Sequence, residues 1–327
     1  MLDPAVHEGT TKARETSDAP FFTVFTPTFN RAQTLHRVFD SLCNQTLRDF
    51  EWVVVDDGST DDTPELIDKW TGKATFPIRY LRQPNSGKHI AHNIAVREAR
   101  GVLFAPLDSD DALEPDALER IRSTWLKIPV AERPRYSGIG SLCRDQQGNI
   151  IGVPFPTSPF DADFRESFFV RRRFGGEKWG ISRTDVLRQF PFPDIHGTNF
   201  VPEALLGFQM ARVYKRRYVN EVFRIYYVGD ETGGATLTGR DNIARGALGR
   251  LYFYAWILNN EMAFFPRAPL PFIKAAVMLP VVARYGGVTI GEVWRQLKGW
   301  RAKTLFLAAS PLALALGVRQ ALRLSSE

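Results

Sequence analysis

Four short apolar runs in the first third of the chain constrain its fold more than any other feature. They cover residues 21–26, 51–55, 78–81 and 102–107 and are rich in the β-branched and aromatic residues that favour strands. Stretches with helical spacing of apolar residues separate them. Alternating strands and helices form right-handed βαβ units, so the sequence predicts an α/β, Rossmann-like fold with a mainly parallel sheet flanked by helices.

The helices between these strands have recognisable starts. Asn30 is suited to cap a helix that ends near residue 44, and Pro64 stands in the first turn of a helix over 63–70. A third helix is expected over 89–100. Each strand is followed by a polar turn. These turns should meet at one edge of the sheet, where open α/β sheets bind ligands.

Beyond residue 116 the pattern weakens. Residues 154–178 are rich in Pro, Phe and Arg and have little periodicity, which is typical of functional loops. The three arginines at 171–173 are either a solvated face or a site for an anionic acceptor or lipid headgroup. The remaining expected elements are helices over 118–128 and 204–215 and strands over 138–143 and 218–227.

Residues 108–111, Asp-Ser-Asp-Asp, directly follow the fourth apolar run. Two carboxylates one residue apart can share a hard divalent cation, which prefers oxygen ligands. The alternative is local: Asp111 caps a helix that follows at once, and Glu114 completes a capping box. Both interpretations can hold together. Capping accounts for only one of the three aspartates, so the cluster is a candidate metal site.

Two other polar turns carry candidate ligand contacts. Asp57, after the second run, either accepts hydrogen bonds from a ligand or forms an Asx turn before a helix. Gly58 beside it permits a close backbone approach. Residues 85–89, Asn-Ser-Gly-Lys-His, precede the third expected helix. A lysine and free amides near a helix N-terminus suit a diphosphate, although the upstream glycine of a P-loop is absent.

Three residues of the second half are candidates for catalysis or for contact with a ligand. Glu203 follows Pro202 at the start of an expected helix, and it is either a first-turn acid favoured by the helix dipole or a general base. Trp179 and His196 flank irregular segments. They either contact a sugar or, as is commoner for such a tryptophan, pack in the core.

The excess of positive charge is confined to the C-terminal part. From Asp241 onward there are 11 Lys and Arg against 4 Asp and Glu, although the whole chain has a formal charge of only +6. Two apolar stretches there, 268–283 and 304–318, are flanked by basic residues and fall short of the roughly 20 apolar residues of a spanning helix. They either lie on an anionic bilayer surface or pack on the domain or on a second copy.

The first 20 residues are polar and contain no apolar signal segment, so we expect a disordered leader. The two cysteines, Cys43 and Cys143, fit neither a disulfide framework nor a metal-ligand spacing. These features predict a cytoplasmic protein, peripheral on the inner face of the cytoplasmic membrane if the apolar stretches bind lipid. No nucleic-acid partner is expected, and the sequence leaves open whether the chain forms a homo-oligomer.

Four motifs, in order, resemble those of the family 2 inverting glycosyltransferases, which have the GT-A fold. They are 24–31 (Val-Phe-Thr-Pro-Thr-Phe-Asn-Arg), 55–61 (Val-Asp-Asp-Gly-Ser-Thr-Asp), 85–88 (Asn-Ser-Gly-Lys) and 107–111 (Leu-Asp-Ser-Asp-Asp). The resemblance covers about residues 21–116. More weakly, 176–179 (Gly-Glu-Lys-Trp) and 200–203 (Phe-Val-Pro-Glu) are similar to acceptor-side elements of one bacterial subset.

The resemblance implies how the chain is divided and where its donor binds. The implied parts are a leader (1–20), a nucleotide-sugar-binding half (21–116), an acceptor-binding half (117–240) and a helical, basic extension (241–327). The implied donor-binding residues are Thr26, Pro27, Thr28, Phe29, Arg31, Asp57, Gly58, Asn85, Gly87, Lys88, Asn93, Asp108 and Ser109.

The resemblance also implies the catalytic roles. Asp110, together with Asp108, would ligate Mg²⁺ or Mn²⁺ on the donor diphosphate, and Trp179 and His196 would contact the acceptor. Glu203 would take the proton of the acceptor hydroxyl as it attacks the anomeric carbon, inverting its configuration. The commoner family pattern supplies the base from a Glu-Asp pair, whereas residue 204 is Ala. The alternative bases are Glu177, Asp194 and Asp185.

The predicted function is metal-dependent transfer of a sugar from a nucleotide-diphosphate sugar, expected to be UDP-linked, to a glycan or lipid-linked acceptor in a bacterial surface polysaccharide. One alternative is a sugar-nucleotide pyrophosphorylase, which would need a Gly-rich loop with Arg or Lys after the first strand. Residues 26–30 are not such a loop. The other alternative is a membrane-associated scaffold that binds a nucleotide without turnover.

Overall fold

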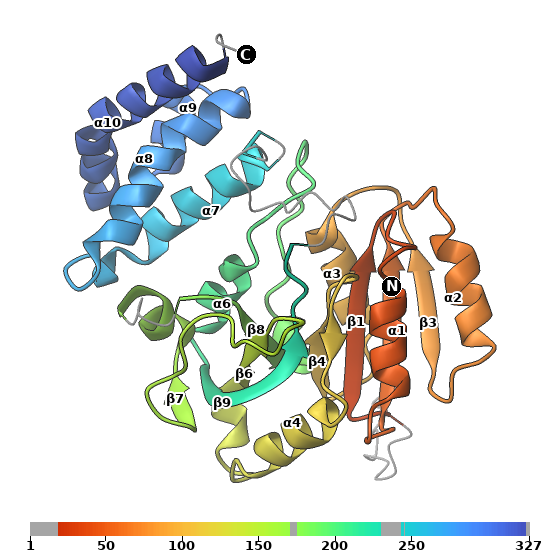
Figure 1. Cartoon of the computed structure of the whole chain (residues 1–327). Coiled ribbons are helices and arrows are strands. Elements are labelled where there is room, and N and C mark those ends of the chain that lie inside the picture. Colours follow the sequence, from red (N-terminus) through yellow and green to blue (C-terminus); the bar gives the residue numbers. More distant parts are fainter. Residues whose placement is uncertain (1–18, 171–174, 230–242, 245, 325–327) are drawn as a thin grey trace, which may run out of the picture.

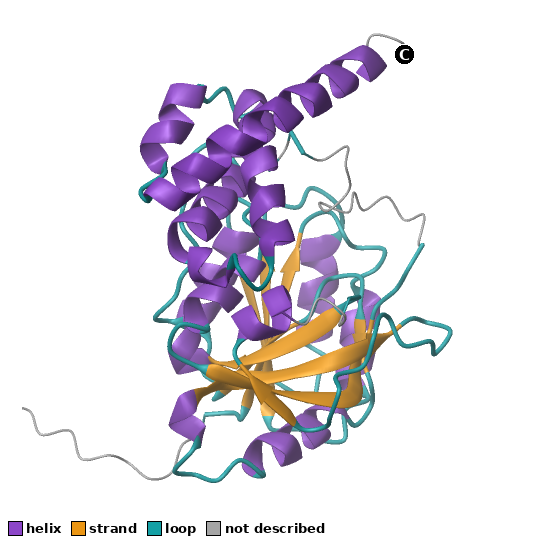
Figure 2. Ribbon diagram, turned by 90° about the vertical axis from the view of Figure 1, so that its left-hand side faces the viewer, coloured by secondary structure: helices purple, strands orange, loops and turns teal. Residues whose placement is uncertain are grey.

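The computed structural model describes residues 19–170, 175–229, 243–244 and 246–324, with only the backbone described in 313–324. The chain has two parts, a sheet with helices on both faces and a group of C-terminal helices at one end of it (Figures 1 and 2). All but two residues of the predicted leader, and the arginines at 171–173, lie outside the described residues.

The described strands form one nine-stranded sheet in the order β3-β2-β1-β4-β8-β6-β9-β5, with β7 paired to β9. The four strands β1 to β4 all pair in parallel: β1 with β2, β1 with β4, and β2 with β3. β6 runs parallel to β9, and β8 is antiparallel to both β4 and β6. The strands are β1 (Phe22–Thr28), β2 (Phe50–Asp56), β3 (Ile78–Arg82), β4 (Leu103–Pro106), β5 (Ala112–Leu113), β6 (Tyr136–Arg144), β7 (Phe160–Ala162), β8 (Lys178–Arg183) and β9 (Lys215–Ile225).

Helices cover both faces of the sheet because side chains alternate along each strand. Phe22 and Val24 of β1 pack in a core with α1, α2 and α4, whereas Phe25 packs in another core with α3, α5 and α6. The helices of this part are α1 (His36–Cys43), α2 (Thr63–Thr71), α3 (Lys88–Glu98), α4 (Ala117–Leu126), α5 (Thr184–Leu187) and α6 (Ala204–Met210), with short η1 (Arg133–Arg135) and η2 (Glu166–Val170).

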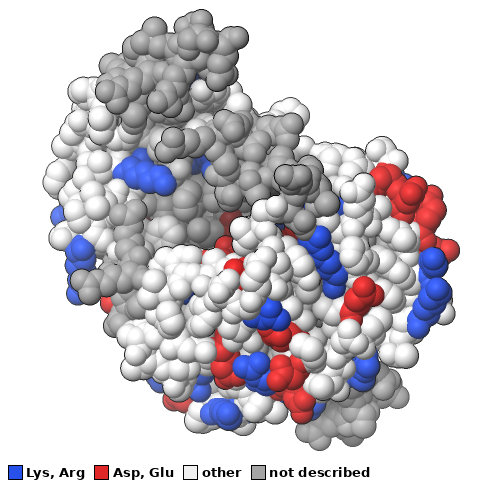
Figure 3. Space-filling model, viewed as in Figure 1, with Lys and Arg blue, Asp and Glu red and all other residues white. Residues whose placement is uncertain are grey.

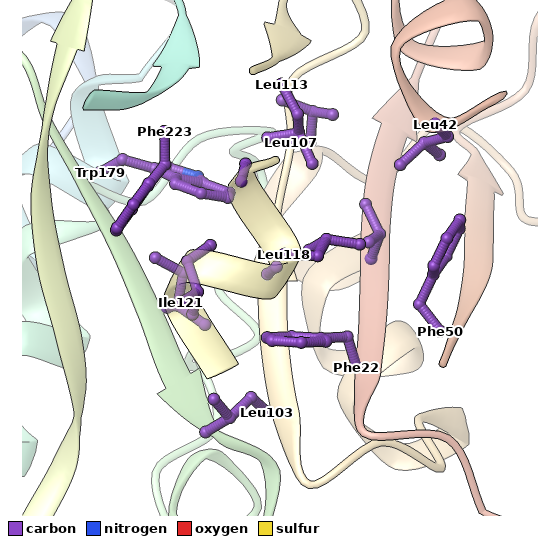
Figure 4. Close-up of a cluster of buried hydrophobic side chains, with 14 of the residues drawn as sticks. Phe22, Leu42, Phe50, Leu103, Leu107, Leu113, Leu118, Ile121, Trp179 and Phe223 are labelled. Carbon is purple, nitrogen blue, oxygen red and sulfur yellow. The ribbon is translucent and has the colours of Figure 1, made fainter. Parts of the chain in front are cut away.

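The larger core lies between the sheet and α1, α2 and α4 (Figure 4). Phe22, Phe50 and Leu103 fill it near the amino ends of the parallel strands. Trp179 lies beside Phe223, on the side of the core opposite Phe50. Burying such a side chain fully contributes about 1.5–3 kcal/mol. This core therefore fixes the strands that position the polar turns.

The helix after β1 begins later than the sequence predicts. α1 starts at His36 and no side chain caps it. Asn30 has a left-handed backbone, with φ 51°, and its Oδ1 accepts a hydrogen bond from the Thr60 N–H at 2.8 Å. The prediction that Asn30 caps this helix is wrong, because the side chain instead joins the turn after β1 to the turn after β2.

The prediction that Asp111 and Glu114 cap a helix is also wrong. The residues after Asp111 form β5, and α4 starts only at Ala117. The Asp111 carboxylate is buried and paired with Arg224, and Glu114 is paired with Arg144. Both arginines come from strands far along the chain, so tertiary ion pairs replace the local cap.

Two boundaries in the second half also differ from the prediction. The helix predicted over 204–215 ends at Met210, and the strand predicted from Tyr218 begins at Lys215. The stretch 154–178 contains β7 and the π-helical turn η2. An eleven-residue strand pairs with β5, β6 and β7. These pairings override the local helical preference beyond Met210.

The C-terminal helices have a core of their own, which also takes in Phe169 and Phe208 from the sheet part. A capping box, in which Thr289 and Glu292 exchange hydrogen bonds, starts one of them. No helix in the described part of the chain is long and apolar enough to cross a membrane. These helices are α7 (Ala247–Asn260), α8 (Pro269–Tyr285), α9 (Ile290–Gln296) and α10 (Trp300–Leu324), with short η5 (Met262–Phe264).

Candidate active site

The carboxyl ends of β1, β2 and β4 lie side by side, as the sequence predicts. Thr28 ends β1 and is paired with Asp56, which ends β2. Leu107, directly after β4, donates its N–H to the carbonyl of Phe25 in β1 at 2.7 Å. The acidic residues 108–111 therefore leave the sheet beside the turns that follow β1 and β2.

Lys88 joins the two halves of the predicted site. Its Nζ lies 2.5 Å from Asp108 Oδ1 and 2.6 Å from Glu203 Oε1. Lys88 begins α3, Asp108 follows β4, and Glu203 directly precedes α6. The structure thus connects the first acidic residue after β4 to the predicted base through one ammonium group.

A buried arginine that the sequence analysis missed stands behind the acidic cluster. Arg224 of β9 is 5% exposed. Its Nη2 lies 2.7 Å from Asp111 Oδ2, 3.5 Å from Asp108 Oδ2 and 3.6 Å from Glu177 Oε1. Its one sequence signal was a charge inside an expected strand, because arginine is rarely buried unless it is paired.

Asp110 is more accessible than its neighbours. Its side chain is 41% exposed and lies 3.6 Å from Arg31 Nη1, and Arg37 donates to its backbone carbonyl at 3.2 Å. Within the described residues, no group of three or more His, Cys, Asp or Glu side chains is arranged to hold a metal. Asp108 and Asp110 are the carboxylates of this site that could hold a cation such as Mg²⁺, which commonly binds one or two carboxylates together with phosphate and water.

The charges of this site are paired within the protein itself. Burial would raise the pKa of Asp108, but Lys88 and Arg224 lower it to about 2. Burial would lower the pKa of Lys88, but Asp108 and Glu203 raise it above its ordinary value. Acidic and basic side chains also intermingle over the sheet part on the face drawn in Figure 3.

Two carboxyl groups near Arg224 have the opposite shift. Burial raises the pKa of Asp111 to about 7, although Arg224 opposes the effect. Burial likewise raises the pKa of Glu177 against the same guanidinium. Asp111 depends on Arg224 for its charge, which makes it a structural partner of β9 and not an open metal ligand.

Asp57 holds the turn before α3 in place. Its Oδ1 accepts hydrogen bonds from Gln83 Nε2 at 2.6 Å and from the Ser86 N–H at 2.7 Å, and its Oδ2 accepts one from the Gly87 N–H at 2.9 Å. The local turn is made by Asp56, whose Oδ1 accepts from the Ser59 N–H. Asp57 therefore holds the loop that presents Lys88. Its predicted contact with the nucleotide-sugar donor stays a prediction.

The residues at the carboxyl end of β1 and just beyond it differ in what they offer a ligand. Thr26 is fully buried, and its hydroxyl accepts a hydrogen bond from Trp52 Nε1 at 3.0 Å. The Thr26 side chain thus supports the turn from within the core, and its contact with the nucleotide stays a prediction. Thr28 is buried with a hydroxyl that has no hydrogen-bond partner, and the Phe29 ring is 45% exposed. An exposed aromatic ring is suited to stack on a base.

Asn93 lies one helical turn beyond the site and serves another purpose. Its Nδ2 donates to the carbonyl of Phe192 and its Oδ1 accepts from the N–H of the same residue, each at 2.9 Å. Both ends of its amide therefore tie α3 to this segment, and a contact of Asn93 with the donor stays a prediction. Asn85, in contrast, accepts a hydrogen bond from Asn199 Nδ2 at 2.6 Å.

Trp179 is a core residue. It is 2% exposed, its Nε1 donates to the carbonyl of Pro106 at 2.5 Å, and it packs beside Phe223 (Figure 4). The structure thus shows the core packing that the sequence offered as the alternative, and a contact of Trp179 with the acceptor stays a prediction. His196 is exposed in the loop before α6, where its acceptor contact stays a prediction.

The alternative bases lie at different places. Asp185 is paired with Arg183 at 2.5 Å. Because β8 is antiparallel to β4, this pair lies at the amino end of β4, opposite Asp108. Asp194 is exposed on the loop before α6, and Glu177 lies close to Arg224. The positions favour Glu203, which has the direct link to Lys88.

Comparison with known proteins identifies a family domain in the sheet part of the chain. Residues 23–184 match the model of Glycosyl transferase family 2. The chain therefore carries a domain of glycosyl transferase family 2. Glu203, Arg224 and the C-terminal helices lie beyond the matched residues.

Two curated relatives illustrate the range of the match. The chain is 28% identical over 249 residues to the GalNAc(5)-diNAcBac-PP-undecaprenol beta-1,3-glucosyltransferase of Campylobacter jejuni, covering 74% of this chain and 75% of the relative. It is 42% identical over 108 residues to the chondroitin synthase of Pasteurella multocida. That alignment covers 33% of this chain and only 11% of the synthase.

Two solved structures have the same fold. A mannosyltransferase from Pyrobaculum calidifontis in complex with GDP-Man and Mn²⁺ superimposes with a TM-score of 0.55 at 21% identity, covering 93% of this chain and 84% of that one. S. aureus TarS 1-349 in complex with UDP-GlcNAc gives 0.51 at 19% identity, covering 88% and 79%. The predicted GT-A fold class is confirmed.

Proposed function

We propose that this chain transfers a sugar from a nucleotide-diphosphate sugar to a hydroxyl group of an acceptor, with inversion at the anomeric carbon. The observation that carries the proposal is the chain of contacts from Asp108 through Lys88 to Glu203. It joins the acidic cluster of the family 2 domain to a carboxylate at the start of α6. Binding of a nucleotide alone would not require a carboxylate on the other side of Lys88, whereas transfer to a hydroxyl group requires a proton acceptor there.

The donor side follows from the turns at the edge of the sheet. Phe29 and the loop held by Asp57 would receive the nucleotide, and Lys88 and Arg31 would face its diphosphate, as cations commonly do. UDP is the nucleotide we propose. The two structural neighbours hold GDP-Man and UDP-GlcNAc, respectively, so a GDP-linked donor is the outcome to test against it.

We also propose a divalent cation, Mg²⁺ or Mn²⁺, held by Asp110 with Asp108. Each of these carboxylates faces a basic side chain, Arg31 or Lys88, which can turn to the diphosphate when the cation takes its place. A bound cation would offset the charge that builds on the departing nucleoside diphosphate.

The reaction balances with one proton acceptor. The acceptor oxygen bonds to the anomeric carbon from the face opposite the nucleotide, while the bond between that carbon and the diphosphate oxygen breaks. The hydroxyl proton passes to the carboxylate of Glu203. Lys88, 2.6 Å from Glu203 Oε1, holds that carboxylate toward the donor side. Nucleoside diphosphate leaves with the bonding electron pair.

For the acceptor we propose a lipid-linked glycan, reached from a membrane surface. The name of the Campylobacter relative places its acceptor on PP-undecaprenol. In this chain, Trp300, Leu307 and Leu312 are exposed along α10. Lys298 and Arg301 are exposed near its start. Apolar and basic side chains together suit an anionic bilayer surface, and sedimentation with anionic vesicles tests this placement.

Release of nucleoside diphosphate from a panel of UDP- and GDP-sugars, with Mn²⁺ and a lipid-linked acceptor, tests the reaction. We expect Glu203→Gln and Asp110→Ala to lower kcat by about 10²–10⁴-fold, because a lost general base or cation ligand acts on the transition state. Only Asp110→Ala should weaken binding of UDP with Mn²⁺ in calorimetry.

Glu221→Gln is the matched control. This glutamate of β9 also pairs with a basic side chain, Arg120 of α4, at 2.7 Å, but the pair lies outside the candidate site. Asp185→Asn tests the alternative base at the opposite edge. Full transfer by Glu203→Gln would refute the assignment of the base. Nucleotide binding without turnover on any donor would favour the scaffold.

A further inference from the structure

The segment that carries Glu203 rests against two glycines from distant parts of the chain. A Cβ on Gly87 would lie 2.1 Å from the carbonyl oxygen of Asn199, and a Cβ on Gly249 of α7 would lie 1.8 Å from that of Phe200. Real Cβ atoms essentially never come within 3.0 Å of such a neighbour. Two successive carbonyls are thus in direct contact with glycine backbone.

Further contacts hold the same segment. A Cβ on Gly246 would lie 2.6 Å from Cδ1 of the Phe200 ring, and the Arg250 guanidinium lies 4.7 Å from the centre of that ring. Gly249 and Arg250 lie three and four residues after Gly246, the N-cap of α7, so all three lie on one side at the start of the helix. Asn199 is held from the donor side by its hydrogen bond to Asn85.

The position of α7 depends on the C-terminal helices. Leu251, Ala255 and Leu258 are buried in their core. Phe253 and Trp256 pack both against that core and against the core of α3 and α6 in the sheet part. α7 therefore joins the two parts, and Figure 1 shows it as the C-terminal helix between the sheet part and α8.

We propose that α7 is a positioning element for the catalytic base. Its glycine face and Gly87 together hold residues 199–200 at the one distance that keeps Glu203 within reach of Lys88. The C-terminal helices are in this way part of the catalytic apparatus, in addition to any role at a membrane. This inference rests on the proposed function, since it takes Glu203 as the base.

Gly249→Ala is the direct test, with Gly291→Ala as its matched control. Both glycines are in helices, but a Cβ on Gly291 of α9 would meet nothing within 4 Å. We expect Gly249→Ala to lower kcat for transfer about 10–100-fold, because misplacing a catalytic group by about an ångström costs that much. The dissociation constant for UDP with Mn²⁺ should change less than about twofold, and Gly291→Ala should match the unaltered protein.

Two readouts separate positioning from general loss of structure. In the Glu203→Gln background, Gly249→Ala should change the residual kcat by less than about twofold, because residues that act through one another are not additive. Hydrogen exchange should become faster in residues 198–206 and stay unchanged in β1 to β3. An equal fold-loss in both backgrounds, or unaltered kcat in folded Gly249→Ala, would overturn the proposal.

Gly246→Ala provides a second variant in case Gly249→Ala does not fold. Its Cβ meets a ring that can turn, so a smaller loss of kcat is expected, and no loss in either variant refutes the inference. If the unaltered protein transfers no sugar, the proposed function fails. The exchange measurement still decides whether α7 holds the segment.

Discussion

At the scale of single residues, Arg224 shows how the site is held. A guanidinium removed from water is costly unless carboxylates surround it. Arg224 has Asp111 at 2.7 Å, and Asp108 and Glu177 within 3.6 Å. It keeps three negative groups together at one end of β9, and it leaves Asp108 free on its other side for Lys88.

We therefore predict that Arg224→Met destabilises the protein by about 3–5 kcal/mol, because it leaves the buried Asp111 carboxylate without its partner. Urea denaturation followed by circular dichroism measures the change. Arg135→Met is the control: Arg135 pairs with Glu132 three residues away at the surface, and such pairs contribute about 1 kcal/mol or less. Equal losses in the two variants would contradict the buried role.

The residues of the site could be predicted where a local motif marks them. Asp108, Lys88 and Glu203 were each found from their place at the end of a strand or the start of a helix, and the structure brings them together. Arg224 could not be found in this way, because its partner Asp111 is 113 positions distant. The sequence could not decide whether Trp179 is buried, because burial of a ring depends on tertiary packing, which no motif records.

At the scale of elements, α3 joins the site to the core. Its His92 lies among the rings of Phe25, Phe104 and Phe192, with centroid distances of 5.9, 5.3 and 5.2 Å. His92 Nδ1 is buried without a hydrogen-bond partner. Burial, assisted by the charge of Lys88, lowers the pKa of His92 to about 3. The folded chain therefore keeps this ring neutral in mild acid.

This shift predicts a loss of stability in acid. Between about pH 6.5 and pH 3 the unfolded chain protonates His92 and the folded chain does not, so the free energy of unfolding falls as the pH falls. We expect on the order of 1–3 kcal/mol less at pH 4 than at pH 7 from this group. In denaturation measured as a function of pH, His92→Leu should remove this contribution to the fall in the free energy of unfolding. His36→Leu, at an exposed position, should leave it in place. Equal acid sensitivity in both variants would refute it.

Whole elements were predicted best where burial is continuous. β2 is buried along its full length, and its apolar run marked it clearly. The helix after β1 was misplaced because Asn30 is as suited to a left-handed turn as to a cap. The end of α6 was misplaced because pairing of β9 with three other strands determines where the strand begins.

At the scale of the whole molecule, the exposed side of α10 predicts membrane binding that salt weakens. Trp300 is 73% exposed, and Leu307 is seven residues, or two turns, further along the same side. We expect the protein to sediment with anionic vesicles at low ionic strength and to be released in part at 1 M salt, where charges are screened within about 3 Å. Trp300→Ala with Leu307→Ser should reduce binding several-fold.

Val130→Ser with Val213→Ser is the matched control for this surface, since both valines are exposed on the sheet part. Binding that is equal with neutral vesicles, or unaffected by the α10 changes, would favour the other interpretation of the tail. In that case the apolar stretches of the C-terminal helices pack on the domain or on a second copy and do not bind the membrane.

The contact between Gly87 and Asn199 has a consequence for exchanging parts between related enzymes. The loop before α3 and the loop before α6 are also joined by the hydrogen bond between Asn85 and Asn199, which are 114 positions apart. The family match ends at residue 184, between these two loops. A chimaera joined at residue 184 would take Lys88 from one protein and Glu203 from another, so the contacts that place each of them would no longer match. We therefore expect the smallest exchangeable module to extend from residue 85 to the end of α7 at Asn260, so that Lys88, Glu203 and the helix beside residues 199–200 are transferred together.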